Sequence, residues 1–387
     1  MPNRFLRLAL ASWGGFLLVA ASLLIFMRQN ATITPYILYD QREAGFGTII
    51  RRDLSTRTRL PLTDRRLDAS TPFWSPGYRW VAFQERTLDS NNILRSTISL
   101  MYPDGSHQRR LTNPMLNGHW HLHGWSPDGR WLLVTSAGNY LDSEIFRIHA
   151  TTGAIRAITR NQVEDRYPAW SPDGRWIAYI SNQSRQDDLY RVSIDGQQIE
   201  RLTRDAAREA LPTWSQDSVW VVFAAHTGRG VDLYRVAAAG GPSQRLTFLE
   251  AGSISLPQRA PGQDRFAFTL LLPRQSQRQL MLIDGDGGNL TLASHQSVIG
   301  DPIWSADGRW LYFFSPNPVD RSVEDLYRVA ANASAPGQVV ETAVASASAR
   351  ISPAPLVNLN FHTAPLLLAC FSILGLAGLL RLQDRSG

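Results

Sequence analysis

The chain has 387 residues and a formal net charge of +6, and each of its 39 lysine-or-arginine positions is an arginine. Because it contains no lysine, a Schiff-base lysine and the lysine of a Walker-type phosphate loop are both excluded. Its single cysteine, Cys370, excludes an internal disulfide and a metal site built from several cysteines. The positive charge is spread along the chain without a long run of like charges, so we expect no nucleic-acid partner.

The first element is an apolar segment at residues 8–27, which carries no charged side chain. About 20 residues in a helix cross the hydrocarbon core of a membrane, so we predict a transmembrane helix or uncleaved signal anchor. Arg4 and Arg7 precede it and favour a cytoplasmic location for residues 1–7. A cleaved signal peptide is the alternative, but the apolar core is long and no clear small-x-small cleavage site follows before Arg28.

The middle of the chain, residues 36–353, repeats one short motif, whose fullest form is Trp-Ser-Pro-Asp-Gly-Arg-Trp at residues 170–176. The tryptophans that open its copies are Trp74, Trp125, Trp170, Trp214 and Trp304. A degenerate copy begins at Arg259, in the gap between the last two. Most intervals are about 45 residues, which is the length of a four-stranded blade in a β-propeller.

Each copy predicts the same succession of a turn and strands. Proline presets φ, aspartate hydrogen-bonds its own backbone and glycine adopts positive φ, so the Ser-Pro-Asp-Gly portion is a turn. In the copy that begins at Trp170, β-rich runs follow at 176–180, 189–194 and 199–203. We interpret the aspartates of these turns as turn caps: Asp128, Asp173, Asp217 and Asp307.

Short strands at regular spacing indicate a closed, all-β array of small sheets. One twisted four-stranded sheet cannot bury both of its faces, whereas sheets arranged around an axis cover each other's apolar faces. We expect the repeat tryptophans between neighbouring blades, where each buries about 150–250 Å². Residues 36–64 resemble a unit without its first strand, and residues 349–353 resemble the missing strand. We therefore predict one composite blade built from both ends and a seven-bladed propeller, with six blades as the alternative.

The Trp-Ser-Pro-Asp-Gly-Arg units, followed by Leu-Tyr-Arg-Val strands such as 189–192, resemble the TolB-type (PD40, WD40-like) propeller repeat. The resemblance covers roughly residues 36–353 and implies a propeller of four-stranded blades. Proteins with this repeat include periplasmic scaffolds and the propeller domains of prolyl-oligopeptidase-like peptidases. This chain has no Gly-x-Ser-x-Gly elbow, and no hydrolase or TolB-type α/β domain beside the propeller. The resemblance therefore implies architecture and not activity.

Three histidines alternate with apolar residues just before Trp125, namely His119, His121 and His123. In a strand they share one face, with Trp120 and Leu122 on the other, near the channel expected at the centre of the ring. We treat them as candidate binding residues at the channel rim. Imidazole suits zinc or nickel, but rings about 7 Å apart along a strand are strained as ligands of one ion. No metal and no cofactor is therefore predicted.

A second apolar segment, at residues 364–380, is followed by Arg381 and Arg385. We predict a second transmembrane helix there, with a cytoplasmic tail at 381–387. A processed sorting signal is the alternative for this end. Two spans with both termini in the cytoplasm place everything between them on the extracytoplasmic side of a bacterial cell membrane.

No spacing of serine, histidine and acidic residues selects a catalytic triad, so no catalytic residue is predicted. The leading hypothesis is a binding or scaffold module, not an enzyme, that contacts a protein, peptide or glycan through its rim loops and channel mouth. The first alternative is a propeller enzyme or accessory subunit, hydrolase-like or lyase-like, that works at the channel. The second is a ligand sensor that acts through a membrane partner.

Overall fold

The computed structural model describes residues 34–43, 46–54, 56–88, 94–113, 119–137, 143–319, 323–332, 338–345 and 352–356. The predicted membrane segments at 8–27 and 364–380, with their flanking tails, lie outside these residues. Residues Pro35–Ala354 form one compact unit. Apart from one 3-10 turn, η1 (Arg65–Leu67), the described elements are β-strands. No helix in this part of the chain is long and apolar enough to cross a membrane.

The first sheet joins the two ends of the propeller region. Its strands are, in spatial order, β29 (Ser352–Leu356), β1 (Thr34–Glu43), β2 (Phe46–Asp53) and β3 (Arg59–Pro61). The last strand in the sequence lies beside the first, which confirms the predicted composite sheet. β2 pairs antiparallel with both of its neighbours, so that Tyr39 lies opposite Ile50 and Ile50 lies opposite Pro61. Backbone pairing between the two ends of the region thereby closes the array.

The next strands belong to one eight-stranded sheet that consists of two antiparallel halves. The first half is β4 (Ala69–Trp74), β5 (Val81–Leu88), β6 (Leu94–Met101) and β7 (Arg109–Arg110). The second half is β8 (His119–Trp125), β9 (Trp131–Ala137), β10 (Ser143–His149) and β11 (Ile155–Ala157). The halves meet where Ser96 of β6 pairs in parallel with His119 of β8.

Further antiparallel sheets follow in chain order. One is β12 (Asp165–Trp170), β13 (Trp176–Ser181), β14 (Asp188–Ser193) and β15 (Ile199–Arg201). The next is β16 (Arg208–Trp214), β17 (Trp220–His226), β18 (Val231–Ala237) and β19 (Gln244–Arg245). The third is β20 (Ser253–Ile254), β21 (Gln258–Arg259), β22 (Arg265–Leu271), β23 (Gln279–Asp284) and β24 (Thr291–Ser294), in which β20 and β21 both pair with β22. The last is β25 (Ile299–Trp304), β26 (Trp310–Pro316), β27 (Val323–Ala330) and β28 (Gln338–Ala345).

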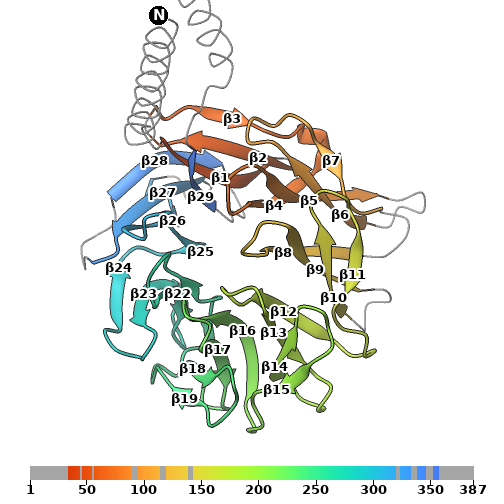
Figure 1. The fold of residues 1–387 in the computed structure, drawn as a ribbon. Coiled ribbons are helices and arrows are strands. Elements are labelled where there is room, and N and C mark those ends of the chain that lie inside the picture. Colours follow the sequence, from red (N-terminus) through yellow and green to blue (C-terminus); the bar gives the residue numbers. More distant parts are fainter. Residues whose placement is uncertain are drawn as a thin grey trace, which may run out of the picture. The chain divides into compact units, whose positions relative to one another are not determined.

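The sheets lie around a common centre, with β4, β8, β12, β16 and β25 innermost (Figure 1). Apolar side chains are buried between adjacent sheets. One cluster joins Ile180 of β13 to Val221 and Phe223 of β17, and another joins Leu282 of β23 to Phe313 of β26. Each sheet thus covers the apolar face of its neighbour, as radial stacking requires. The fold is all-β and propeller-like, as the repeat predicts.

Candidate functional site

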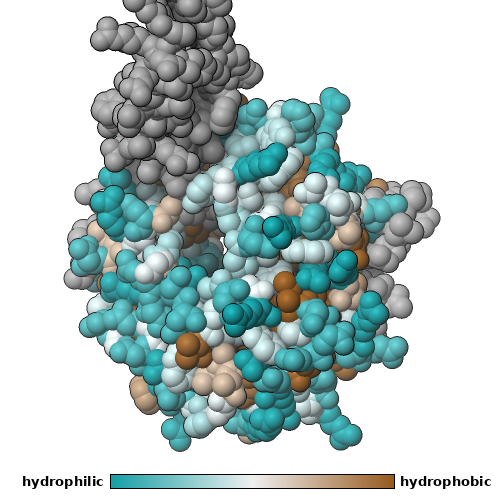
Figure 2. Space-filling view, viewed as in Figure 1, coloured by the Kyte–Doolittle hydropathy of each residue, from teal (hydrophilic) through white to brown (hydrophobic). Residues whose placement is uncertain are grey.

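A cavity of about 850 Å³ lies among the innermost strands. Its lining comes mainly from β4, β8, β12, β16, β20, β21 and β25 and from the loops beside them. In Figure 1, β4, β8, β12, β16 and β25 surround the centre of the ring, so the cavity lies at this centre. The face of the molecule seen in Figure 2 is mostly hydrophilic, with hydrophobic residues in scattered patches.

Prolines shape the wall of this cavity. A proline stands two residues before Arg259 and before each repeat tryptophan other than Trp125: Pro72, Pro168, Pro212, Pro257 and Pro302. The residues before three of these prolines have positive φ, namely 56° at Thr71, 52° at Tyr167 and 56° at Leu211. The pairing register shifts at the same places, so each of these inner strands contains a β-bulge. Proline has no N–H and leaves no unpaired donor in the bulge. The recurring Pro-x-Trp spacing is the sequence signal of this feature, and the predictions above did not use it.

Apolar and charged groups line the same cavity. Tyr167, Leu211 and Leu256 precede the prolines of three successive sheets, and all three line the cavity. Tyr167 is 42% exposed, so part of this residue is accessible to solvent. Arg259, Arg278 and Asp301 are further lining residues. The cavity therefore suits a molecule that offers apolar groups together with charged or hydrogen-bonding groups.

Two of these charged groups are held by neighbouring side chains. Nη2 of Arg278 donates to Oγ of Ser253 at 3.1 Å, and Nη1 of Arg259 donates to the side-chain oxygen of Gln216. Burial lowers the pKa of Arg259, but an arginine in a protein stays protonated at physiological pH. The cavity thus contains fixed positive charge in defined positions.

The three predicted histidines all lie in β8 and differ in exposure. Along this strand Trp120 and Leu122 are buried, whereas His121 is exposed and His119 and His123 are half-buried. Of these three histidines, His123 is among the described residues that line the cavity. Its Nε2 lies 3.0 Å from Oγ1 of Thr135. Within the ranges that the structure describes, no three His, Cys, Asp or Glu side chains are grouped so that they could hold a metal ion.

Three of the repeat tryptophans hydrogen-bond across to a neighbouring sheet or to the neighbouring half of the eight-stranded sheet. Nε1 of Trp125 donates to the carbonyl oxygen of Phe73 at 3.2 Å, and Nε1 of Trp214 donates to that of Ala169 at 3.0 Å. Nε1 of Trp304 donates to the carbonyl oxygen of Gln258 at 2.8 Å. Phe73 belongs to β4, in the preceding half of the eight-stranded sheet, whereas Ala169 of β12 and Gln258 of β21 belong to the sheets that precede those of Trp214 and Trp304. Each indole therefore fixes the spacing between two neighbouring inner strands.

The remaining repeat tryptophans make other contacts. Trp74 packs edge-to-face against Tyr78, with ring centroids 6.1 Å apart. Nε1 of Trp170 is buried, and it has no hydrogen-bond partner among the described residues.

The repeat aspartates lie in the turns that follow the inner strands. Oδ1 of Asp173 accepts from Oγ of Ser171 at 2.5 Å and from the backbone N–H of Arg175 at 3.0 Å. The hydroxyl of Ser171 in turn accepts from the backbone N–H of Trp176 at 2.9 Å. The same bonds recur at Asp128, Asp217 and Asp307. This geometry is that of an aspartate that closes a turn.

Two buried acids at the start of inner strands were not predicted from the sequence. Asp165 and Glu209 stand five residues before Trp170 and Trp214, where other copies carry apolar residues such as Ala69. Burial raises the pKa of Asp165 to about 6. Burial and the adjacent carboxylates of Asp205 and Asp188 raise the pKa of Glu209 to about 9. An acid at a repeat position that is otherwise apolar is the signal that identifies them.

Comparisons with known proteins agree with this architecture. The family model described as the TolB beta propeller domain (PD40) matches residues 106–208 and 168–334. A solved structure assigned to TolB from Agrobacterium tumefaciens is similar with a TM-score of 0.54 and 20% identity, over 78% of this chain and 100% of that one. An oligogalacturonate lyase from Vibrio parahaemolyticus has a TM-score of 0.56 and 12% identity, over 79% and 85% of the two chains.

A puromycin-hydrolyzing peptidase from Mycobacterium tuberculosis is similar with a TM-score of 0.52 and 14% identity, over 73% of this chain and 50% of that one. No curated protein sequence matches the chain. At such identities the similarity to solved structures concerns the fold alone. The family model, in contrast, matches more than half of the sequence, and the chain belongs to the TolB β-propeller domain (PD40) family.

Proposed function

We propose that this protein is a membrane-anchored binding or scaffold module on the extracytoplasmic side of a bacterial cell, which takes a peptide segment of a partner protein into its central cavity. The observation that carries the proposal is the lining of the cavity of about 850 Å³, where Tyr167, Leu211 and Leu256 lie beside Arg259 and Asp301. A peptide offers apolar side chains and a polar backbone together, so it matches both kinds of group.

The anchoring and the blade number are further parts of the proposal. Two apolar segments, at 8–27 and 364–380, support attachment to the membrane. We count seven blades by taking the composite sheet, each half of the eight-stranded sheet and the four sheets that follow as one blade each. The closed ring of blades forms the cavity before a ligand binds, so binding requires little loss of conformational entropy in the protein.

Membership of the TolB propeller family supports binding over catalysis. The similarity to a lyase and a peptidase, at 12% and 14% identity, concerns the fold and adds no reaction to the proposal.

A photo-crosslinking amino acid at position 167 in the full-length chain tests the proposal in cells. The matched control carries the same amino acid at Ile199, which is 49% exposed on the outer strand β15. We expect a reproducible protein adduct from position 167 that the Ile199 variant does not give. Absence of an adduct at 167, or the same adducts from both positions, would contradict binding of a partner in the cavity.

A further inference from the structure

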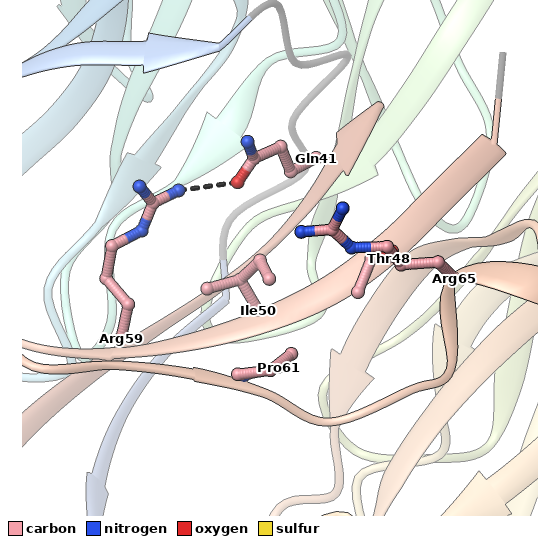
Figure 3. Close-up of a pocket in the computed structure, with 6 residues that line it drawn as sticks. All are labelled: Gln41, Thr48, Ile50, Arg59, Pro61 and Arg65. Carbon is pink, nitrogen blue, oxygen red and sulfur yellow. Dashed lines mark hydrogen bonds between the residues drawn. The ribbon is translucent and has the colours of Figure 1, made fainter. Parts of the chain in front are cut away.

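A smaller pocket of about 260 Å³ lies on the composite sheet (Figure 3). Its lining residues are Gln41, Thr48, Ile50, Arg59, Pro61 and Arg65, and none of them lines the central cavity. We propose that this pocket is a separate binding site for a phosphate group carried by a small molecule or by a lipid.

The polar part of the pocket is held in place by the sheet. Gln41 of β1 lies opposite Thr48 of β2, and these side chains are only 9% and 7% exposed. Nη2 of Arg59 donates to Oε1 of Gln41, and Nε of Arg59 donates to the hydroxyl of the buried Tyr39 at 3.0 Å. These bonds use two of the five N–H donors of a guanidinium and orient the others. Arg59 is therefore positioned before any ligand arrives.

The charge of the pocket selects an anion. In Figure 3 the guanidinium groups of Arg59 and Arg65 lie on opposite sides of Ile50, with Gln41 above it. The described lining contains two cationic side chains and no carboxylate. The surrounding segment, residues 56–66, has four arginines and one aspartate. Arginine is the side chain best suited to phosphate, because its planar fork binds two oxygens at once.

The floor and the size of the pocket favour a substituted phosphate. Ile50 and Pro61 supply an apolar floor, so the pocket also accepts an apolar part of the ligand. The volume of about 260 Å³ is several times the ~30 Å³ that one water occupies in the liquid. It leaves room for a phosphate and for part of the group to which the phosphate is esterified.

Titration calorimetry of the full-length chain with inorganic phosphate at low ionic strength tests the site. We expect saturable binding that weakens on the order of tenfold in Arg59→Gln and in Arg65→Gln, because each variant removes charge-assisted hydrogen bonds. Arg57→Gln is the matched control, since Arg57 is exposed in the same segment but does not line the pocket. It should keep wild-type affinity within about twofold, as expected for a charge that makes no direct bond.

Absence of phosphate binding to the wild-type chain would overturn the proposal, as would an equal loss in Arg57→Gln. Thr48→Val keeps the shape of the side chain and removes its hydroxyl. If this variant binds phosphate more weakly but melts at the same temperature as wild type, the hydroxyl contacts the ligand and the loss is not a folding defect. Glycerol 3-phosphate and short-chain phosphatidylglycerol, each compared with short-chain phosphatidylcholine, distinguish the source of the phosphate. Arg59-dependent binding of glycerol 3-phosphate supports a soluble phosphomonoester, and that of phosphatidylglycerol supports an anionic lipid headgroup.

Discussion

The indole nitrogen of Trp304 donates a hydrogen bond across 2.8 Å to the backbone carbonyl of Gln258, which belongs to the innermost strand of the preceding sheet. Trp214 and Ala169 repeat this relationship at 3.0 Å. The motif tryptophan is thus more than apolar filling between blades. It also links neighbouring strands at the wall of the central cavity, where a change in their spacing would change the site.

Replacing these tryptophans by phenylalanine separates the hydrogen bond from the packing. Trp214→Phe loses a buried hydrogen bond, worth about 1 kcal/mol, in addition to packing. Trp170→Phe loses packing too, but it removes a buried N–H that has no partner in the described part of the chain. Equilibrium urea unfolding should therefore show a larger loss of free energy for Trp214→Phe than for Trp170→Phe. Equal losses would contradict a structural role for the inter-sheet bond.

Glu209 is expected to make the fold less stable in alkali. Its folded pKa of about 9 lies above its ordinary value of 4.5, so the folded state holds a proton that the unfolded chain releases. Stability from this group is complete below the unfolded pKa and declines as pH rises towards the folded pKa. Glu209→Gln keeps the shape and does not titrate. It should melt above wild type at about pH 8 and close to it at about pH 5.

The control for Glu209 is Glu200→Gln, because Glu200 is 45% exposed and pairs with Arg191 at 2.7 Å. This exposed substitution should give no gain in melting temperature on going from acid to alkali. A gain equal to that of Glu209→Gln would show that the effect does not come from the buried carboxyl.

Asp217 is expected to make the fold less stable in acid, which is the opposite pH dependence to that of Glu209. Hydrogen bonds from the hydroxyl of Ser215 and the backbone N–H of Val219 lower its pKa below the ordinary 3.8. Asp217→Ala should cost about 1 kcal/mol at neutral pH, as expected for lost turn hydrogen bonds. The stabilisation is present above the unfolded pKa and is lost as pH falls through the folded pKa, so the two proteins should converge in strong acid. Melting temperatures across the acid range check this, and a constant difference would argue against it.

Tyr167 is expected to lower the stability of the fold and to strengthen binding of the partner in the cavity. Its φ of 52° is a left-handed conformation that an aromatic residue adopts at a cost and that asparagine tolerates better. Tyr167→Asn should therefore leave the melting temperature unchanged or raise it. With a photo-crosslinker at Leu256, which lines the same cavity, the variant should give less partner adduct. If Tyr167→Asn is less stable than wild type and gives as much partner adduct, Tyr167 contributes to folding and not to binding.

Much of the architecture follows from local backbone preferences that can be recognised in the sequence. The Ser-Pro-Asp-Gly turn needs proline, aspartate and glycine at successive positions, so the sequence predicts both the turn and the strands beside it. The composite sheet also follows, because a first strand missing at residues 36–64 reappears near the other end of the repeat region. The alternation of buried and exposed side chains in β8 follows from the two-residue period of a strand.

The histidines of β8 show what these local preferences do not predict, namely which side chains reach the cavity. Their shared face is predictable, but the register in β8 shifts between Leu122 and Gly124, so the strand contains a bulge at His123. His123 stands two residues before Trp125, the position that Pro168 and Pro212 hold in the next two copies, and like them it lines the cavity. His119 and His121 are not among the described lining residues. Which member of an alternating set reaches a ligand depends on the local bend of the strand, and that bend depends on pairing with the next strand.

By itself, the sequence determined the repeat, its turns, its strand-rich composition and its closure by both ends, because these depend on local backbone preferences and on a regular interval. The tertiary structure alone decided which side chains meet around the central cavity and at the arginine pocket. Tyr167, Leu211 and Leu256 come from three sheets, and Arg59 reaches Gln41 across a sheet from two strands away. Such contacts require the ring to be closed and its registers set, and no short stretch of sequence contains that information.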